Sequence, residues 1–162
     1  MNELEKGALK GVKVLDFSTL LPGPLASLFL AETGAEVIKI ERPVTGDEMR
    51  LSHPKWNDES VSFSMLNRGK KSLCLDLKDQ SCKDILKPLI QTADIIIEQF
   101  RPGVMKRLGL DYESIKKINS KIIYVSITGY GQTGPKKMVA GHDLNYIGNT
   151  GLLSLSMGTK EK

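Results

Sequence analysis

The chain has 162 residues, 40% of them hydrophobic and 26% charged, which is typical of a globular domain and excludes a disordered chain. No apolar run approaches the roughly 20 residues of a membrane span, and the start MNELEKGALKGVK lacks the apolar core of a signal peptide. We therefore expect a cytoplasmic protein without a membrane span. The net charge of +4 is scattered and aromatic residues make up only 6%, so nucleic-acid binding is not expected. Surface solubility or a small polyphosphate ligand would each explain the charge.

The first half of the chain predicts a strand-helix-strand unit and then an irregular segment. The apolar run VKVLDFS (12–18) predicts a buried strand that ends at the breaker TLLPGP. A helix up to Gly34 follows, and the alternating AEVIKIERP (35–43) predicts a second, parallel strand. From Thr45 to Asn67 the sequence is polar, and we expect a long loop that carries His53.

The second half alternates strands with helices. Three further strands are predicted from KSLCLDL (71–77), ADIIIEQF (93–100) and KIIYVSITGYG (121–131). We expect a helix capped by Asp79 and disturbed by Pro88, a short helix in RPGVMKRLGL, a helix capped by Asp111, and a last helix beginning in GHDLNYIGNTGLL. This order predicts a parallel, doubly wound α/β domain whose ligands bind at the carboxyl ends of the strands.

The turns after the strands contain the candidate binding residues. None carries a GxGxxG or GK[ST] pattern, so a dinucleotide or nucleoside triphosphate site is not supported. Arg42, Arg101 and Arg107 could each bind a phosphate through paired N–H donors, although isolated surface arginines are common. His142 directly precedes Asp143, whose carboxylate could orient the imidazole or raise its basicity. In the alternative interpretation, Asp143 caps a helix and His142 is a polar bystander.

The two cysteines, Cys74 and Cys82, form neither a CxxC pair nor a zinc-type pattern with the histidines. We expect both to be reduced, half-buried thiols. No metal site is predicted.

Four segments occur in a recognisable order between about Leu9 and Met157. They are LKGVKVLDFSTLLPGPLASLFLAETGAEVIKIERP, MLNRGKKSLCLDLK, ADIIIEQFRPGVMKRLGL and ITGYGQTGP. Together they resemble the family III CoA-transferases (CaiB/BaiF type), which include the α-methylacyl-CoA racemases. The resemblance implies a Rossmann-like α/β domain, a parallel sheet with helices on both faces, that binds an acyl-CoA thioester and no cofactor beyond CoA. It implies CoA contacts at Arg42, Leu75, Gln99, Phe100, Arg107 and Leu108.

The segment AGHDLNY is similar to the racemase branch of the family. The resemblance implies that His142 exchanges the proton α to the thioester carbonyl through an enolate, and that Asp143 positions His142 or the substrate. In the transferase branch a tyrosine commonly stands in place of this histidine, and CoA moves between carboxylic acids through an aspartyl anhydride. We therefore expect a 2-methylacyl-CoA racemase, with a CoA-transferase as the alternative.

The resemblance also implies parts that this sequence does not contain. Both branches use an essential aspartate well beyond the position of His142, whereas the sequence ends at Lys162. Family members are far longer and form interlocked homodimers. We therefore expect residues 1–162 to be one truncated CoA-binding domain that lacks the second domain, exposes apolar helix faces and is inactive alone. A CoA-binding module without catalysis is the third possibility.

Overall fold

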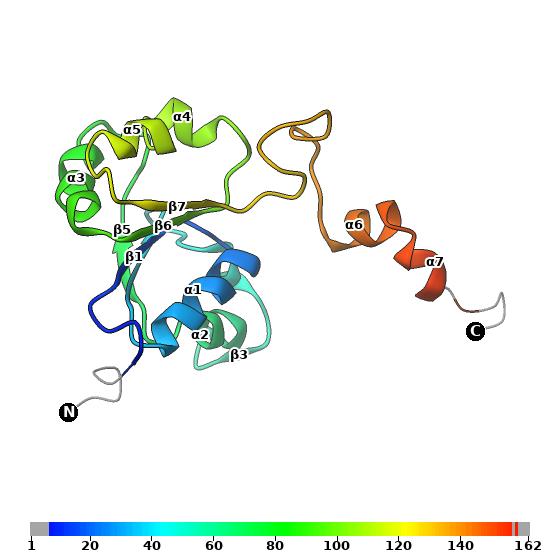
Figure 1. The fold of residues 1–162 in the computed structure, drawn as a ribbon. Helices are drawn as coiled ribbons and strands as arrows, with labels where there is room; N and C mark the ends of the chain where they lie inside the picture. The colour runs from blue at the N-terminus through cyan, green and yellow to red at the C-terminus, as the bar shows by residue number, and fades with distance from the viewer. Residues whose placement is uncertain (1–6, 157, 159–162) are drawn as a thin grey trace. The chain divides into compact units, whose positions relative to one another are not determined.

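The computed structural model describes residues 7–156 and 158. Contacts divide the chain into two units, Met1–Ile127 and Thr128–Lys162. In the first unit, five parallel strands form one sheet, in the order β5-β2-β1-β6-β7 (Figure 1). The strands are β1 (Lys13–Asp16), β2 (Glu36–Glu41), β5 (Lys71–Cys74), β6 (Ile95–Glu98) and β7 (Ile123–Ser126). The predicted parallel α/β fold is confirmed.

Helices cover both faces of the sheet. One face carries α1 (Pro22–Glu32) and α2 (Val61–Asn67), and the other carries α3 (Cys82–Thr92), α4 (Val104–Leu108) and α5 (Tyr112–Lys116) (Figure 1). Because successive side chains of a strand point to opposite faces, each face has its own apolar core. Val14 packs in the cluster that includes Ala31 of α1. Its neighbour Leu15 packs in the cluster that includes Leu86 of α3.

The segment between β2 and β5 is more regular than the sequence predicted. It contains a 3₁₀ helix η2 (Glu48–Leu51), the hairpin strands β3 (Lys55–Trp56) and β4 (Glu59–Ser60), and α2. The hydroxyl of Ser60 caps α2 by accepting the N–H of Phe63 at 3.3 Å. The prediction of a long irregular loop is therefore wrong here, because a seven-residue helix is too short for its hydrophobic period to be recognised.

Two details of the helices differ from expectation and one agrees. Pro88 does not interrupt α3, which runs from Cys82 to Thr92. The N-cap of α3 is Ser81, whereas Asp79 accepts the N–H of Ser81 at 2.9 Å in the turn before the helix. The predicted cap at Asp79 is thus wrong by two residues, because its carboxylate stabilises a turn instead. Asp111 is the N-cap of α5, as predicted.

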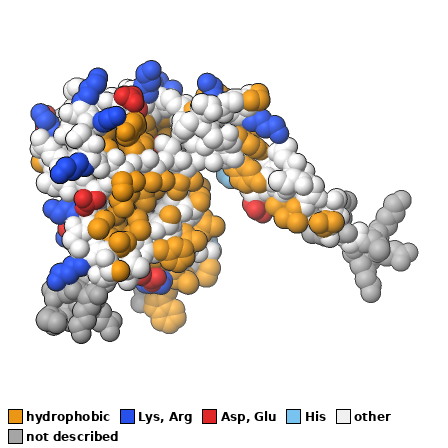
Figure 2. Space-filling model, in the orientation of Figure 1, with side chains coloured by type: hydrophobic (Ala, Val, Ile, Leu, Met, Phe, Trp, Pro, Cys, Tyr) orange, Lys and Arg blue, Asp and Glu red, His pale blue; other side chains and the backbone are white. Residues whose placement is uncertain are grey.

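Apolar side chains gather on the surface of α1, α2 and β3 (Figure 2). Phe29, Met65 and Trp56 are 58%, 59% and 76% exposed. Exposed apolar helix faces, expected from the sequence, are therefore present in the described part of the chain.

The second unit contains α6 (Asp143–Asn149) and α7 (Leu152–Ser156), so the helix predicted in GHDLNYIGNTGLL is confirmed. The ring of Tyr146 packs edge to face on Tyr130, with 5.4 Å between the centroids. Its hydroxyl donates to the carbonyl of Gly141 at 2.8 Å. The ring contact joins the segment ITGYGQTGP, through Tyr130, to α6 within this unit.

Candidate functional site

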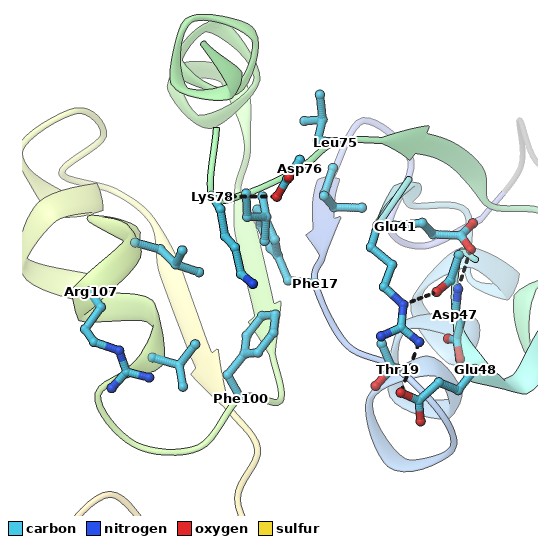
Figure 3. Close-up of a pocket in the computed structure, with 16 residues that line it drawn as sticks. Phe17, Thr19, Glu41, Asp47, Glu48, Leu75, Asp76, Lys78, Phe100 and Arg107 are labelled. Carbon is cyan, nitrogen blue, oxygen red and sulfur yellow. Dashed lines mark hydrogen bonds and ion pairs between the residues drawn. The ribbon is translucent and has the colours of Figure 1, made fainter. Parts of the chain in front are cut away.

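The sheet order creates a switch point between β1 and β6. The chain passes from β1 to β2 and β5 on one side, and from β6 to β7 on the other. In open α/β sheets, ligands bind at the carboxyl ends of the strands near such a point. A pocket of about 530 Å³ lies at this edge of the sheet (Figure 3), within the range of about 300–1,000 Å³ typical of small-molecule sites.

Most of the predicted CoA contacts meet in this pocket. Its lining includes Arg42 at the end of β2, Leu75 after β5, Phe100 after β6, and Arg107 and Leu108 of α4. Five of the six residues named from the resemblance, distant in sequence, are thus brought together. Phe17 and Ile40 extend the apolar part of the lining. The pocket therefore combines an apolar slot with arginines.

Short local features position the residues from β6 and α4. The carboxylate of Glu98 accepts the N–H of Phe100 at 2.8 Å and fixes the turn after β6. The five-residue helix α4 is bounded by Gly103 and Gly109, with φ of +85° and +69°, in a left-handed conformation that glycine adopts without strain. These turns allow so short a helix to place Arg107 beside the pocket.

Two cations of the pocket have no protein partner within the described residues. The guanidinium of Arg107 and the ammonium of Lys78 form neither a hydrogen bond nor an ion pair there. Figure 3 shows both on the same side of the pocket as Phe100. Arg42, in contrast, donates to the carbonyl of Gly46 and to the carboxylate of Glu48, both at 3.1 Å. The pocket therefore presents two cations without counterions and one in an exposed pair.

Several lining residues were not predicted from the sequence. They are Phe17, Thr19, Ile40, Glu41, Gly46, Asp47, Glu48, Asp76, Leu77, Lys78 and Val104. Lys78 lies three residues after Leu75 in the segment KSLCLDLK. This nearness to an expected CoA contact is the one sequence feature that could have indicated its place in the pocket.

Gln99 is not part of the pocket lining. Its side-chain oxygen instead accepts the N–H of Gly23 at 3.0 Å, at the start of α1. A Cβ on Gly23 would lie 2.1 Å from the Cβ of Ser18 and 2.9 Å from this oxygen. Gln99 and Gly23 therefore hold the turn after β1 close to the turn after β6.

The start of α1 has no free N–H among its first four residues. Pro22 and Pro24 have none to offer, and that of Gly23 donates to Gln99. The N–H of Leu25 donates to the preceding turn at 2.9 Å. In dinucleotide-binding folds this helix start holds a pyrophosphate through such N–H groups. The start of α1 therefore offers no free N–H group to a phosphate.

Glu41, the last residue of β2, fixes the wall of the pocket that follows it. Its carboxylate is buried and accepts two hydrogen bonds from Arg50 at 2.7 Å, one from the Ser72 hydroxyl at 2.6 Å and one from the N–H of Asp47 at 2.9 Å. Burial disfavours ionisation, but these bonds outweigh it and lower the pKa of Glu41 to about 2. Arg50 also lies 3.7 Å above the ring of Phe63, which ties this wall to α2.

Replacing Glu41 with glutamine is expected to lower the free energy of unfolding by about 1–2 kcal/mol at neutral pH, because charge-assisted hydrogen bonds are lost while Arg50 stays half exposed to water. In the wild type this stability is complete above the ordinary pKa of 4.5 and is lost as the pH falls toward 2. Urea titrations over this range measure the effect. A Glu59→Gln control, at an exposed carboxylate, should keep the wild-type slope; the same slope in Glu41→Gln would contradict the assignment.

His142 and Asp143 belong to the second unit, at the start of α6. His142 is the N-cap and Asp143 is the first helical residue, and both are exposed. The interpretation in which Asp143 caps this helix is therefore wrong, because the cap lies one residue earlier. The side chain of Asn145 accepts the backbone N–H of His142 at 2.9 Å. This bond fixes the backbone of His142 at the start of α6.

Within residues 7–156 and 158, no cluster of three or more His, Cys, Asp or Glu side chains could hold a metal ion. No helix in the same part of the chain is long and apolar enough to span a bilayer.

Both cysteines are free, with Cys74 exposed and Cys82 buried, so neither is half-buried as expected.

Comparison with known proteins decides the family. The family model of CoA-transferase family III matches residues 9–162. The chain belongs to CoA-transferase family III. Among its relatives, acetyl-CoA:oxalate CoA-transferase of Acetobacter aceti is 44% identical over 138 residues, which cover 85% of this chain and 36% of the relative. Human alpha-methylacyl-CoA racemase is 37% identical over 147 residues, covering 91% and 35%.

A solved structure supports the same family III assignment. The crystal structure of a CaiB/BaiF family protein from Brucella suis matches with a TM-score of 0.88 and 36% identity, over 95% of this chain and 42% of that chain. The family and the fold expected from the four segments are thus confirmed. This family III chain spans about a third of the length of the curated relatives described above.

Proposed function

We propose that the first unit of this family III chain binds the CoA part of an acyl-CoA thioester. The observation that carries the proposal is the pocket in which Leu75, Phe100 and Leu108 lie beside the unpaired cations Lys78 and Arg107. CoA carries a diphosphate and a 3′-phosphate, which such cations can pair with. Its adenine needs an apolar slot of the kind that these side chains form.

We propose further that the whole protein is a 2-methylacyl-CoA racemase. The imidazole of His142 would remove the proton α to the thioester carbonyl, and the electron pair would pass onto the carbonyl oxygen as an enolate. A second acid would return a proton to the opposite face of the α-carbon. Asp143, adjacent in the chain, would position His142 or the substrate.

A CoA-transferase is the second candidate, and the relatives favour it. Six similar curated proteins are named CoA-transferases, and identity to the Acetobacter aceti transferase exceeds that to the racemase. In this reading CoA moves between carboxylic acids through an aspartyl anhydride. For the 162 residues alone, CoA binding without turnover remains the prediction, because one base cannot complete racemisation.

Two measurements test these proposals. Calorimetry of the 162-residue chain with CoA should give saturable heat, and no saturation at millimolar CoA would count against the binding proposal.

The protein expressed from its complete reading frame is then incubated with a 2-methylacyl-CoA in D₂O. Incorporation of α-deuterium supports the racemase, whereas acid-dependent exchange of labelled CoA between thioesters supports the transferase. Light scattering of the same sample tests the homodimer that the resemblance implies, and cell fractionation tests the cytoplasmic location.

Replacing Glu48 with glutamine is expected to tighten CoA binding by about twofold to fivefold. The Glu48 carboxylate occupies Arg42 in an exposed pair, and exposed pairs contribute about 0.2–1 kcal/mol. A phosphate that binds Arg42 must displace this carboxylate, and a neutral amide competes less well. Calorimetry on wild type and variant measures the difference. Weaker binding in the variant would mean that Glu48 orients Arg42 for the ligand instead of competing with it.

A further inference from the structure

Four charged side chains are buried at the carboxyl ends of β1 and β2. Asp16, Lys39, Asp47 and Lys70 have side-chain exposures of 0–2% and form two ion pairs. Lys39 and Asp47 lie 2.8 Å apart, and Lys70 and Asp16 lie 3.5 Å apart. Burying such pairs costs about several kcal/mol per ion, and apolar residues of similar volume often stabilise a fold equally well. Stability alone therefore does not explain these residues.

The first pair holds the beginning of the turn formed by residues 18–24, named here the β1–α1 turn. Lys39 donates to the carbonyl of Ser18 at 2.7 Å. Asp47 accepts the N–H of Leu20 at 3.1 Å. Leu20 has a φ of +62°, a strained conformation for a residue with a side chain. The pair thus holds the strained part of the turn through its backbone.

The second pair holds the end of the same turn and the first helical residues. The ammonium of Lys70 donates to the carbonyl of Pro24 at 2.8 Å, the hydroxyl of Ser27 at 2.7 Å and the side-chain oxygen of Asn67 at 2.9 Å. Asp16 accepts the hydroxyl of Ser27 as well. Burial lowers the pKa of Lys70 to about 8, although the charge of Asp16 acts in the opposite direction. Lys70 therefore links α1, the end of α2 and β1.

The β1–α1 turn contributes to the pocket through Thr19. The place of Thr19 in the pocket wall depends on the conformation of this turn. We infer that Lys39, Asp47, Lys70 and Asp16 are positioning residues, which hold the β1–α1 turn in the conformation that makes Thr19 a wall of the CoA pocket. The inference rests on the proposed CoA binding.

The test separates positioning from stability with a single and a double variant. Lys70→Met removes the donors and leaves Asp16 unpaired, whereas Lys70→Met with Asp16→Asn removes both charges. Hydrogen exchange at the N–H group of Gly23 should quicken by about tenfold or more in both variants, because the end of the turn opens locally. CoA affinity should fall about fivefold to tenfold in both, equivalent to about 1–1.4 kcal/mol. The free energy of unfolding should be lowered in the single variant, in which Asp16 is left unpaired, and should return toward the wild-type value only in the double variant.

The control is Lys71→Met, at the adjacent lysine, which is exposed and pairs with Glu36; both readouts should stay at wild-type values. The inference would be overturned if CoA affinity returned together with stability in the double variant. Unchanged hydrogen exchange at Gly23 would overturn it as well. If the single variant does not fold, the double variant decides alone. If the wild type binds no CoA, the proposed function fails, and the exchange rates still decide whether the network holds the turn.

Discussion

Replacing His142 with alanine is expected to lower α-proton exchange on a 2-methylacyl-CoA by about 10²- to 10⁴-fold, the usual contribution of a general acid–base group. Imidazole gains and loses a proton near neutral pH, and alanine offers no substitute. The measurement is deuterium incorporation from D₂O by the protein expressed from its complete reading frame. Asn145 should still hold the backbone at this position, because it accepts the backbone N–H of His142, which alanine retains.

His53 is the matched control for this variant. It is the other of the two histidines, it is exposed, and it is not among the residues that line the pocket. His53→Ala should exchange the α-proton at the wild-type rate. An unchanged rate in His142→Ala would remove the imidazole from the mechanism. Absence of exchange in the wild type, together with transfer of labelled CoA between acids, would assign the protein to the transferase branch.

Replacing Arg107 with alanine is expected to weaken CoA binding by about 10- to 100-fold, since a charge-assisted hydrogen bond contributes about 1.5–3 kcal/mol. The guanidinium lines the pocket and has no partner within the described residues, so a ligand phosphate need not displace a counterion. Calorimetry with the 162-residue chain measures the loss. The apolar slot should still bind adenine, so some affinity should remain.

Lys106 provides a control of the same charge on the same helix. It is exposed, it neighbours Arg107 in α4, and it does not line the pocket. Lys106→Ala should bind CoA within about twofold of the wild type at physiological salt, where exposed charges are screened over about 8 Å. Equal losses of CoA affinity in Lys106→Ala and Arg107→Ala would mean that long-range attraction by positive charge, and not a direct contact, explains the effect of Arg107. No loss in Arg107→Ala would contradict the phosphate contact.

The central strands β1 and β6 could be predicted from the sequence because they are buried on both faces and form continuous apolar runs. The segment around β6, with its three isoleucines, is an example. The region between β2 and β5 could not be predicted in the same way. Its hairpin strands have two residues each, and the cap of α2 is a single serine, Ser60. Such short elements depend on tertiary contacts, which a local pattern does not contain.

The place of the candidate site at the carboxyl ends of the strands could be predicted from the order of strands and helices, but its residues could be chosen only through the family resemblance. Taken singly, Arg42 and Arg107 were indistinguishable from ordinary surface cations. The structure adds why they differ from one another: Glu48 pairs with Arg42, whereas Arg107 has no counterion among the described residues. Gln99 carries the same kind of sequence signal as its neighbour Phe100, but its side chain turns toward Gly23.

The buried charges could not be predicted from the sequence at all. Lys70 and Lys71 form one basic pair, and surface solubility explained both equally well. In the structure the side chain of Lys70 is 1% exposed and that of Lys71 is 70% exposed. Lys39 likewise interrupts an apolar strand without a visible partner, because Asp47 follows only after the turn. Tertiary packing determines which residues pair with a buried charge, because it brings together groups that are distant in the sequence.

The prolines at the start of α1 have a consequence for the choice among nucleotides. A cell contains NAD, ATP and other nucleotides besides CoA, and many sheets of this architecture receive their phosphates at that helix start. Here Pro22, Pro24 and the occupied N–H of Gly23 leave no free N–H group at the start of α1 for a nucleotide phosphate. Recognition then depends on satisfying the separated cations and the apolar slot together. Without a phosphate contact at the start of α1, the domain would bind most nucleotides weakly. A cofactor that carries phosphates at both ends of its nucleotide would bind more tightly.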